Sequence, residues 1–181
     1  MKNFTLLDEK FDINQTKKYH LSLQLSLNNY SICIIEPESN KYLVAKNYNF
    51  TEEFRFNESS GYDTTFCDKI KEILKKDEFL NKPYDSIKFN YLSKKSTLVP
   101  NTLFEIAKLK SYFTFNNILK EYESINYNKI NHIDAYVIFA VPSFLSTILV
   151  NQYKKIKFYH QCRPFIEYIA SDEYLKRFPS E

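Results

Sequence analysis

The sequence predicts an α/β fold in which a three-stranded antiparallel meander is followed by strand–helix units. Residues 20–27 alternate apolar and polar side chains, as in a half-buried strand, and Asn28-Asn29 then suits a two-residue hairpin turn. Residues 136–141 are continuously apolar, which is typical of a strand buried on both faces in the middle of a parallel sheet. Pro142 ends that strand and opens a helix whose apolar residues recur at helical spacing.

The other elements follow from the same periodicities and from the position of the prolines. Residues 1–18 are mixed and polar, and we expect a loose arm with a few apolar side chains against the sheet edge. Further strands are expected at residues 30–36, 41–48, 87–92, 124–132 and 156–159. Helices are expected from an Asp63 N-cap to Lys76, from Pro100 through Ala107, over residues 117–122, from Ser143 onwards, and from Pro164 through Leu175. No linker or repeat interrupts the pattern, so residues 19–181 are predicted to form a single domain.

Composition excludes several classes of function. The chain of 181 residues contains one glycine, which rules out the glycine-rich loops that bind phosphate. A net charge of +3 is too small to indicate a nucleic-acid or membrane partner. No apolar stretch reaches the roughly 18–20 residues that span a bilayer, and the N-terminus lacks the pattern of a signal peptide. We therefore expect a cytoplasmic protein with three free thiols, Cys33, Cys67 and Cys162.

The predicted order of elements is ribonuclease-H-like, as in nucleases and in each half of the actin-like ATPases. Four segments resemble an uncharacterised bacterial domain family of unknown function related to the actin-like ATPases: LSLQLSLNNYSICIIE, TLVPNTLF, YFTFN and YVIFAVPSFL. Val141-Pro142 also resembles the strand-to-helix junction of the pilus-assembly and cell-division members and of the Hsp70 chaperones. The segment 160–164 occupies the place of their Glu-Pro helix start but lacks the Glu. The resemblance implies one half of a two-lobed fold that holds nucleotide between its lobes.

The residues that would perform chemistry are missing from the expected positions. The turn at Asn28 and Asn29 corresponds to the phosphate-binding turn of the actin-like ATPases, but it has no glycine, and the strand before it has no acid. Two-metal nuclease chemistry requires carboxylates on the central strands, and the strands at residues 20–27 and 87–92 carry none. His160 and Cys162 lie two residues apart without further ligand spacing around them. We therefore predict no catalytic residue, no metal and no cofactor.

An aromatic cluster is the best candidate for an interface, although core packing explains it as well. A second candidate surface lies at the C-terminal ends of the predicted parallel strands, where one lobe would face another. The candidate interface residues are Tyr112, Phe113, Phe115 and Tyr122, with Val141 and Phe144.

The prediction is a non-catalytic binding or scaffolding domain that resembles one lobe of an actin-like ATPase. Its partner would be another protein, a second lobe or a second copy of the chain. One alternative is an ATP-binding protein whose second lobe is missing from this chain or supplied by a partner. A nucleic-acid-processing enzyme is a remote third.

Overall fold

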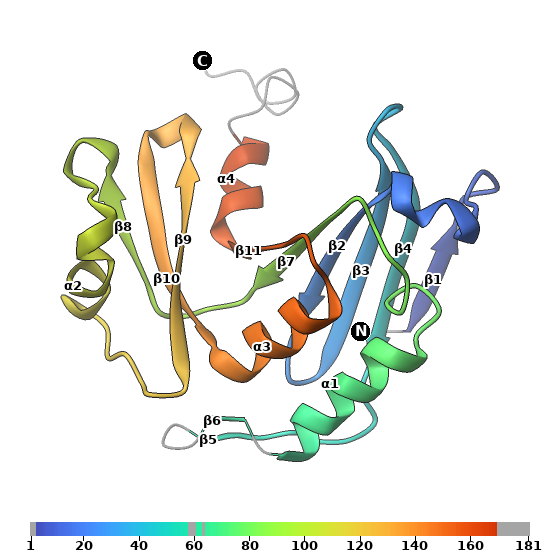
Figure 1. Cartoon of the computed structure of the whole chain (residues 1–181), viewed down its shortest axis with the longest axis horizontal. Coiled ribbons are helices and arrows are strands. Elements are labelled where there is room, and N and C mark those ends of the chain that lie inside the picture. The colour runs from blue at the N-terminus through green and yellow to red at the C-terminus, as the bar shows by residue number, and fades with distance from the viewer. Residues whose placement is uncertain (1–2, 58–60, 63, 170–181) are drawn as a thin grey trace. The chain divides into compact units, whose positions relative to one another are not determined.

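The computed structural model describes residues 3–57, 61–62 and 64–169, and the chain divides into two compact units (Figure 1). Unit 1 comprises residues 1–90 and 142–158, and unit 2 comprises residues 91–141 and 159–181. The chain therefore leaves unit 1 after the strand that follows the first helix and returns at Pro142. The expectation that residues 19–181 fold as a single domain stays a prediction, because two units with such interleaved chain segments can still fold cooperatively.

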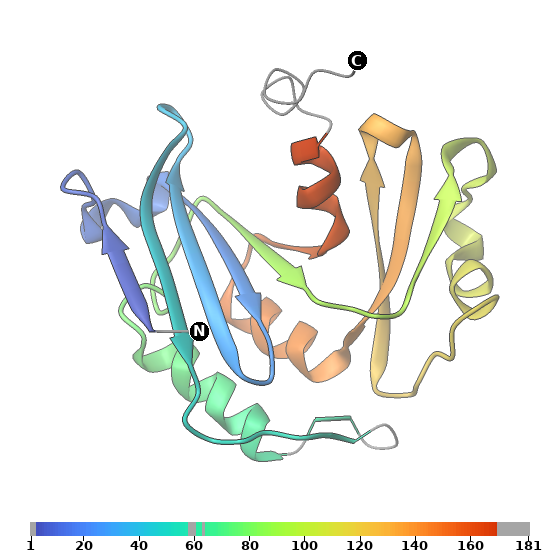
Figure 2. The ribbon, with the colours of Figure 1, turned by 180° about the vertical axis from the view of Figure 1, so that it is seen from behind.

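Unit 1 contains the predicted mixed sheet. Its strands follow the order β1 (Phe4–Leu7), β4 (Lys41–Asn49), β3 (Asn29–Glu36), β2 (His20–Leu25), β7 (Ser86–Tyr91) and β11 (Ile156–His160), the last residues of β7 and β11 being counted with unit 2. β2, β3 and β4 form the predicted antiparallel meander. The expectation of a loose N-terminal arm was wrong for Phe4–Leu7, which pairs antiparallel with β4 at the outer edge of the sheet (Figure 2). A 3₁₀ helix, Ile13–Lys18, follows it.

The core of unit 1 lies on one face of this sheet. The alternating leucines of β2 share that face with Tyr30, Ile32 and Ile34 of β3, and all are buried. Helix α1 (Thr64–Lys76) buries Phe66, Ile70 and Leu74, as its spacing predicted, and contacts α3 (Ser143–Gln152). Figure 1 shows the two helices side by side against the sheet. Asp63, the expected N-cap, lies outside the described residues, and two short strands, β5 (Phe56–Asn57) and β6 (Gly61–Tyr62), pair before α1.

The first hairpin turn lies one residue earlier than the sequence suggested. Leu25 pairs with Tyr30, and the Ser26 backbone N–H donates to the Asn29 carbonyl oxygen at 2.9 Å. The turn therefore runs from Ser26 to Asn29, with Leu27 and Asn28 at its centre rather than the two asparagines.

Unit 2 contains a three-stranded sheet in the order β8 (Ser96–Pro100), β10 (Ala135–Pro142), β9 (Glu123–Ile130), the last residue of β10 being counted with unit 1. The apolar strand at residues 136–141 is buried as predicted, but it is the middle strand of this separate sheet and runs antiparallel to β8. The expectation of a central parallel strand was therefore wrong. A continuous apolar run indicates that a strand is buried on both faces, but it does not indicate whether the strand is parallel or antiparallel to its neighbours.

The helices of unit 2 differ most from expectation. No helix opens at Pro100, because Pro100 ends β8 opposite Ala135 and two 3₁₀ turns follow, Asn101–Leu103 and Ile106–Lys108. The extended residue Phe104 separates the two turns, and its ring stacks on Tyr136 with centroids 3.6 Å apart. The helix expected at residues 117–122 is wrong as well, since α2 is Leu109–Thr114 and buries Phe113. α4 (Cys162–Ile169) begins two residues before Pro164, and Leu175 lies outside the described residues.

Candidate functional site

The turn between β2 and β3 corresponds to the phosphate-binding turn of the actin-like ATPases that the sequence resembles. In this chain the turn is filled by its own side chains. The Ser26 hydroxyl accepts hydrogen bonds from the backbone N–H groups of Asn28 and Asn29, at 3.2 and 3.1 Å. Serine hydroxyls commonly accept hydrogen bonds from nearby backbone N–H groups in turns. A phosphate bound at a turn needs such N–H groups to be free and to point toward it. Here both already have an acceptor within the chain.

The Asn29 side chain ties the turn to the neighbouring strand. Its amide nitrogen donates to Oδ1 of Asn47 at 3.0 Å, and the Ser31 hydroxyl donates to the same oxygen at 2.8 Å. The Ser26 hydroxyl also contacts Oδ1 of Asn29. Asn47 is buried, and its own amide nitrogen has no hydrogen-bond partner within the described part of the chain. The sequence pointed to Asn28 and Asn29 but missed Ser26 and Asn47. A serine three residues before an asparagine at the end of a strand was the available signal for Ser26.

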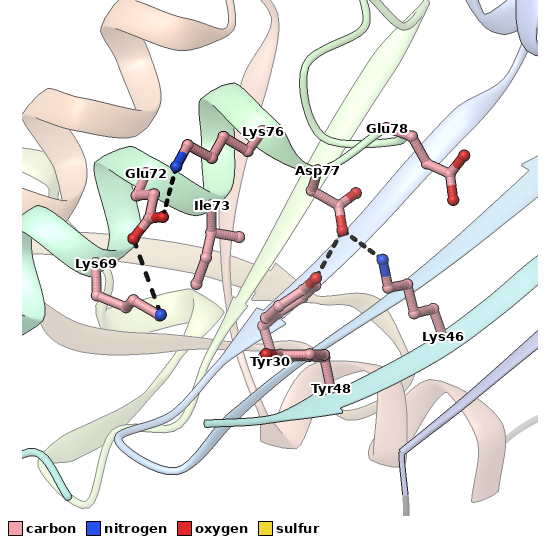
Figure 3. Close-up of a pocket in the computed structure, with 9 residues that line it drawn as sticks. All are labelled: Tyr30, Lys46, Tyr48, Lys69, Glu72, Ile73, Lys76, Asp77 and Glu78. Carbon is pink, nitrogen blue, oxygen red and sulfur yellow. Dashed lines mark hydrogen bonds and ion pairs between the residues drawn. The ribbon is translucent and has the colours of Figure 1, made fainter. Parts of the chain in front are cut away.

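A pocket of about 410 Å³ lies in unit 1, lined by residues of β3, β4 and α1 and by the residues that follow α1 (Figure 3). One of its lining residues, Asp77, directly follows the last residue of α1. The lining residues are Tyr30, Lys46, Tyr48, Lys69, Glu72, Ile73, Lys76, Asp77 and Glu78.

The Asp77 carboxylate is buried and fully bonded. One oxygen accepts from the Tyr30 hydroxyl at 2.6 Å and pairs with the Lys46 ammonium, and the other accepts the N–H groups of Phe79 and Leu80 at 2.9 and 3.1 Å. Burial raises the pKa of the Asp77 carboxyl, but these hydrogen bonds from Lys46, Tyr30 and the backbone outweigh it, so the pKa lies below its ordinary value. Asp77 is therefore a stable anion that anchors the end of α1 to the sheet.

Three further charged residues of this pocket, Lys69, Glu72 and Lys76, are paired as well. Glu72 bonds Lys76 at 2.9 Å and lies 3.9 Å from Lys69, which also bonds Glu52 at 2.8 Å. Burial and the hydrogen bond to Asp77 raise the pKa of the Tyr30 hydroxyl, which therefore stays protonated at neutral pH. A general base or nucleophile needs a pKa near the working pH, and the pKa values of Tyr30 and Asp77 are shifted away from it. The geometry supports a structural role for this cluster, which the sequence did not reveal because Lys46 and Asp77 lie 31 residues apart.

The predicted interface residues are divided by their burial. Phe113 and Val141 are 0% exposed, so their side chains belong to the interior rather than to a surface. Phe144 is half-buried, and its ring lies 6.3 Å from that of Phe66 in unit 1. Tyr122 is also half-buried. Phe115 alone of the six is strongly exposed, at 89%.

An apolar groove of about 400 Å³ in unit 2 includes two of these residues, Tyr112 and Phe115. The core beneath it is formed by Val99, Phe113, Ile138 and Ala140. Leu98 and Leu103, which the sequence did not single out, are more than half exposed in the same groove. The groove residues are Thr97, Leu98, Val99, Pro100, Leu103, Ser111, Tyr112 and Phe115.

The described residues hold neither a cluster of metal ligands nor a membrane-spanning helix. Among residues 3–57, 61–62 and 64–169, no group of three His, Cys, Asp or Glu side chains is arranged to hold a metal ion. In the same part of the chain, every helix is too short or too polar to cross a membrane.

Comparisons with known proteins agree with this fold. A family described as "Protein of unknown function (DUF3822)" matches residues 8–177. A crystal structure from Bacteroides thetaiotaomicron, of a protein with actin-like ATPase fold and unknown function, is similar with a TM-score of 0.71 and 27% sequence identity. The similarity covers 88% of this chain and 58% of that protein, so the chain spans little more than half of its length. No curated protein matches. The predicted fold class, one half of an actin-like ATPase, is confirmed.

Proposed function

The chain belongs to the DUF3822 family of proteins of unknown function, and from this premise we propose that it is a non-catalytic binding or scaffolding domain built on one lobe of an actin-like ATPase. The observation that carries the proposal is the Ser26 hydroxyl, which occupies the turn amides of Asn28 and Asn29. β2, the strand before this turn, reads HLSLQL and supplies no carboxylate to organise a metal. A lobe without these groups keeps its fold and its surfaces but lacks the means to hold a nucleotide phosphate.

Titration of the chain with Mg·ATP is expected to show no binding tighter than a Kd of about 1 mM. The reason is that the turn offers neither free amides nor a nearby acid. Isothermal titration calorimetry measures this, and thermal unfolding with and without Mg·ATP provides a second readout, because a ligand of the native state raises Tm. A cooperative unfolding transition in the same sample is the control for folded protein. A micromolar Kd would show that the turn rearranges and that the proposal is wrong.

A second candidate is an ATP-binding protein completed by a second lobe. The observation that favours it is the length of the similar Bacteroides protein, of which this chain spans 58%. Reading the coding frame beyond Glu181 tests whether a second lobe follows in the same protein. If it does, the titration is repeated on the longer chain, and binding that appears only there supports this candidate.

We propose that the binding surface is the apolar groove of unit 2 and that its partner is a protein segment with apolar side chains, a second lobe or a second copy. Exposed leucine and phenylalanine side chains grouped in one concave place are typical of protein-binding surfaces. The proposed location is the cytoplasm.

Replacing Phe115 by aspartate is expected to leave stability within about 0.5 kcal/mol of the wild type, because the ring is exposed, and to abolish self-association where the groove mediates it. Sedimentation over a hundredfold concentration range measures the mass, which is 21.7 kDa for the monomer. Val150→Asp is the matched control, since Val150 is 53% exposed on α3 and is not a groove residue. A wild-type mass that stays constant would reject self-association, and equal effects of both variants would reject the groove as its site.

A further inference from the structure

His160 and Cys162 of unit 2, which the sequence placed two residues apart without a partner, form a thiol–imidazole pair. His160 ends β11, Cys162 begins α4, and Nδ1 of His160 lies 2.9 Å from Sγ of Cys162. Nδ1 also accepts the backbone N–H of Cys162 at 3.2 Å. The short connection between strand and helix therefore holds the imidazole against the thiol.

The backbone of Ser93 determines which ring nitrogen carries the proton. Nε2 of His160 lies 3.2 Å from the Ser93 carbonyl oxygen, which can only accept a hydrogen bond. Nε2 is therefore the N–H donor, and the lone pair of the neutral ring is at Nδ1, where the Cys162 thiol and the Cys162 backbone N–H share it. Burial lowers the pKa of His160, although the bond to Ser93 opposes it, so the ring is neutral at neutral pH.

The imidazole is rigidly held. His160 is 4% exposed, its backbone N–H donates to Oδ1 of Asn128 at 2.9 Å, and its ring centroid lies 5.3 Å from that of Phe139. Cys162 as a residue is only half-buried. A nucleophile within hydrogen-bond reach of a base, with the base oriented by a third group, is the arrangement that activates nucleophiles in proteins.

The geometry points to Cys162 as a thiol-modification site for small disulfides, with His160 as its base. The sulfur of Cys162 attacks one sulfur of the disulfide R–S–S–R, a new S–S bond forms, and the original S–S bond breaks. Nδ1 of His160 takes the thiol proton as the bond forms and passes it to the departing thiolate, which leaves as R–SH. The products are the mixed disulfide of Cys162 and one free thiol, and the disulfide supplies the only oxidant that the step needs.

Cys33 is the internal comparison. It is half-buried like Cys162, and burial raises the pKa of both thiols. Cys33 lies in β3, where its cross-strand partners are Ser22 and Ala45, neither of which is a base. The two thiols therefore match in burial and differ in the imidazole.

The experiment treats the folded wild-type chain with limiting 4,4′-dithiodipyridine and follows the modification of each cysteine by peptide mass mapping. We expect Cys162 to react at least about tenfold faster than Cys33, within the range of general-base assistance. In His160→Asn, which keeps an oxygen acceptor near the Cys162 N–H but no base, the rate at Cys162 should fall to that of Cys33. Circular dichroism checks that this variant is folded, and if it is not, the ranking of rates in the wild type decides alone. Equal rates at the two cysteines, or a folded His160→Asn variant with an unchanged rate, would overturn the assignment.

Discussion

Replacing Asp77 by asparagine is expected to lower the free energy of unfolding by about 3–5 kcal/mol, the range for breaking a buried ion pair on one side. The Asp77 side chain is 5% exposed and that of Lys46 is 16% exposed. Asparagine keeps the shape of Asp77 but leaves the Lys46 ammonium without its counter-charge away from water. The Tyr30 hydroxyl of β3 bonds the same oxygen, so the substitution also weakens the link between the end of α1 and β3, because a hydrogen bond to a charged oxygen becomes a neutral one. Urea unfolding followed by far-UV circular dichroism measures the difference.

Glu72→Gln is the matched control for Asp77→Asn. Glu72 lies in α1 and also forms ion pairs with lysines, but its side chain is 45% exposed, so the loss should stay below about 1 kcal/mol. Adding Lys46→Met to Asp77→Asn removes the stranded charge and should recover part of the lost stability. If Asp77→Asn unfolds at the same urea concentration as Glu72→Gln, the buried pair does not stabilise the fold.

The loss of stability caused by Asp77→Asn should decrease at acidic pH. The pKa of Asp77 in the folded chain lies below its ordinary value, which is about 3.9. Stability from this carboxylate is therefore fully present above about pH 4 and is lost as the pH falls through the lowered pKa of the folded state. The stability difference between wild type and variant should be constant from about pH 5 to 8 and should shrink on further acidification.

Phe139→Ala is expected to cost about 3–5 kcal/mol, the range for truncating a fully buried aromatic side chain. Phe139 is 0% exposed in β10, the middle strand of the sheet in unit 2, opposite Ser96 of β8. Its ring also lies against His160, so the cavity left by alanine would adjoin a second buried side chain. The same urea titration measures the loss.

Leu98→Ala provides the comparison for Phe139→Ala. Leu98 lies in the neighbouring strand β8, opposite Val137, but is 55% exposed, so its loss should cost less than about 1 kcal/mol. A midpoint for Phe139→Ala close to that of Leu98→Ala would mean that β10 does not hold the core of unit 2.

For the interface candidates in unit 2, the sequence could not separate buried aromatic residues from exposed ones. Aromatic residues in a polar segment indicated that residues 112–122 contact something, but not what. Phe113 lies in the last turn of α2 and Phe115 is the C-cap residue of that helix, and positions two residues apart point to different sides of a helix. One ring is therefore fully buried and the other almost fully exposed. Their roles separated only when the position of α2 relative to β8 and β9 was known.

The sequence by itself determined the meander, the spacing of α1, the strand-to-helix junction at Pro142 and the absence of a glycine-rich phosphate loop. These features are local, because the periodicity of side chains and the backbone limits of proline and glycine act over a few residues. The tertiary structure alone decided the division into two units, the direction of β10, the Lys46–Asp77 pair and the hydrogen bond from His160 to Ser93. Each of these joins residues far apart in the chain, and such pairings depend on which surfaces meet when the chain folds, which no local pattern encodes.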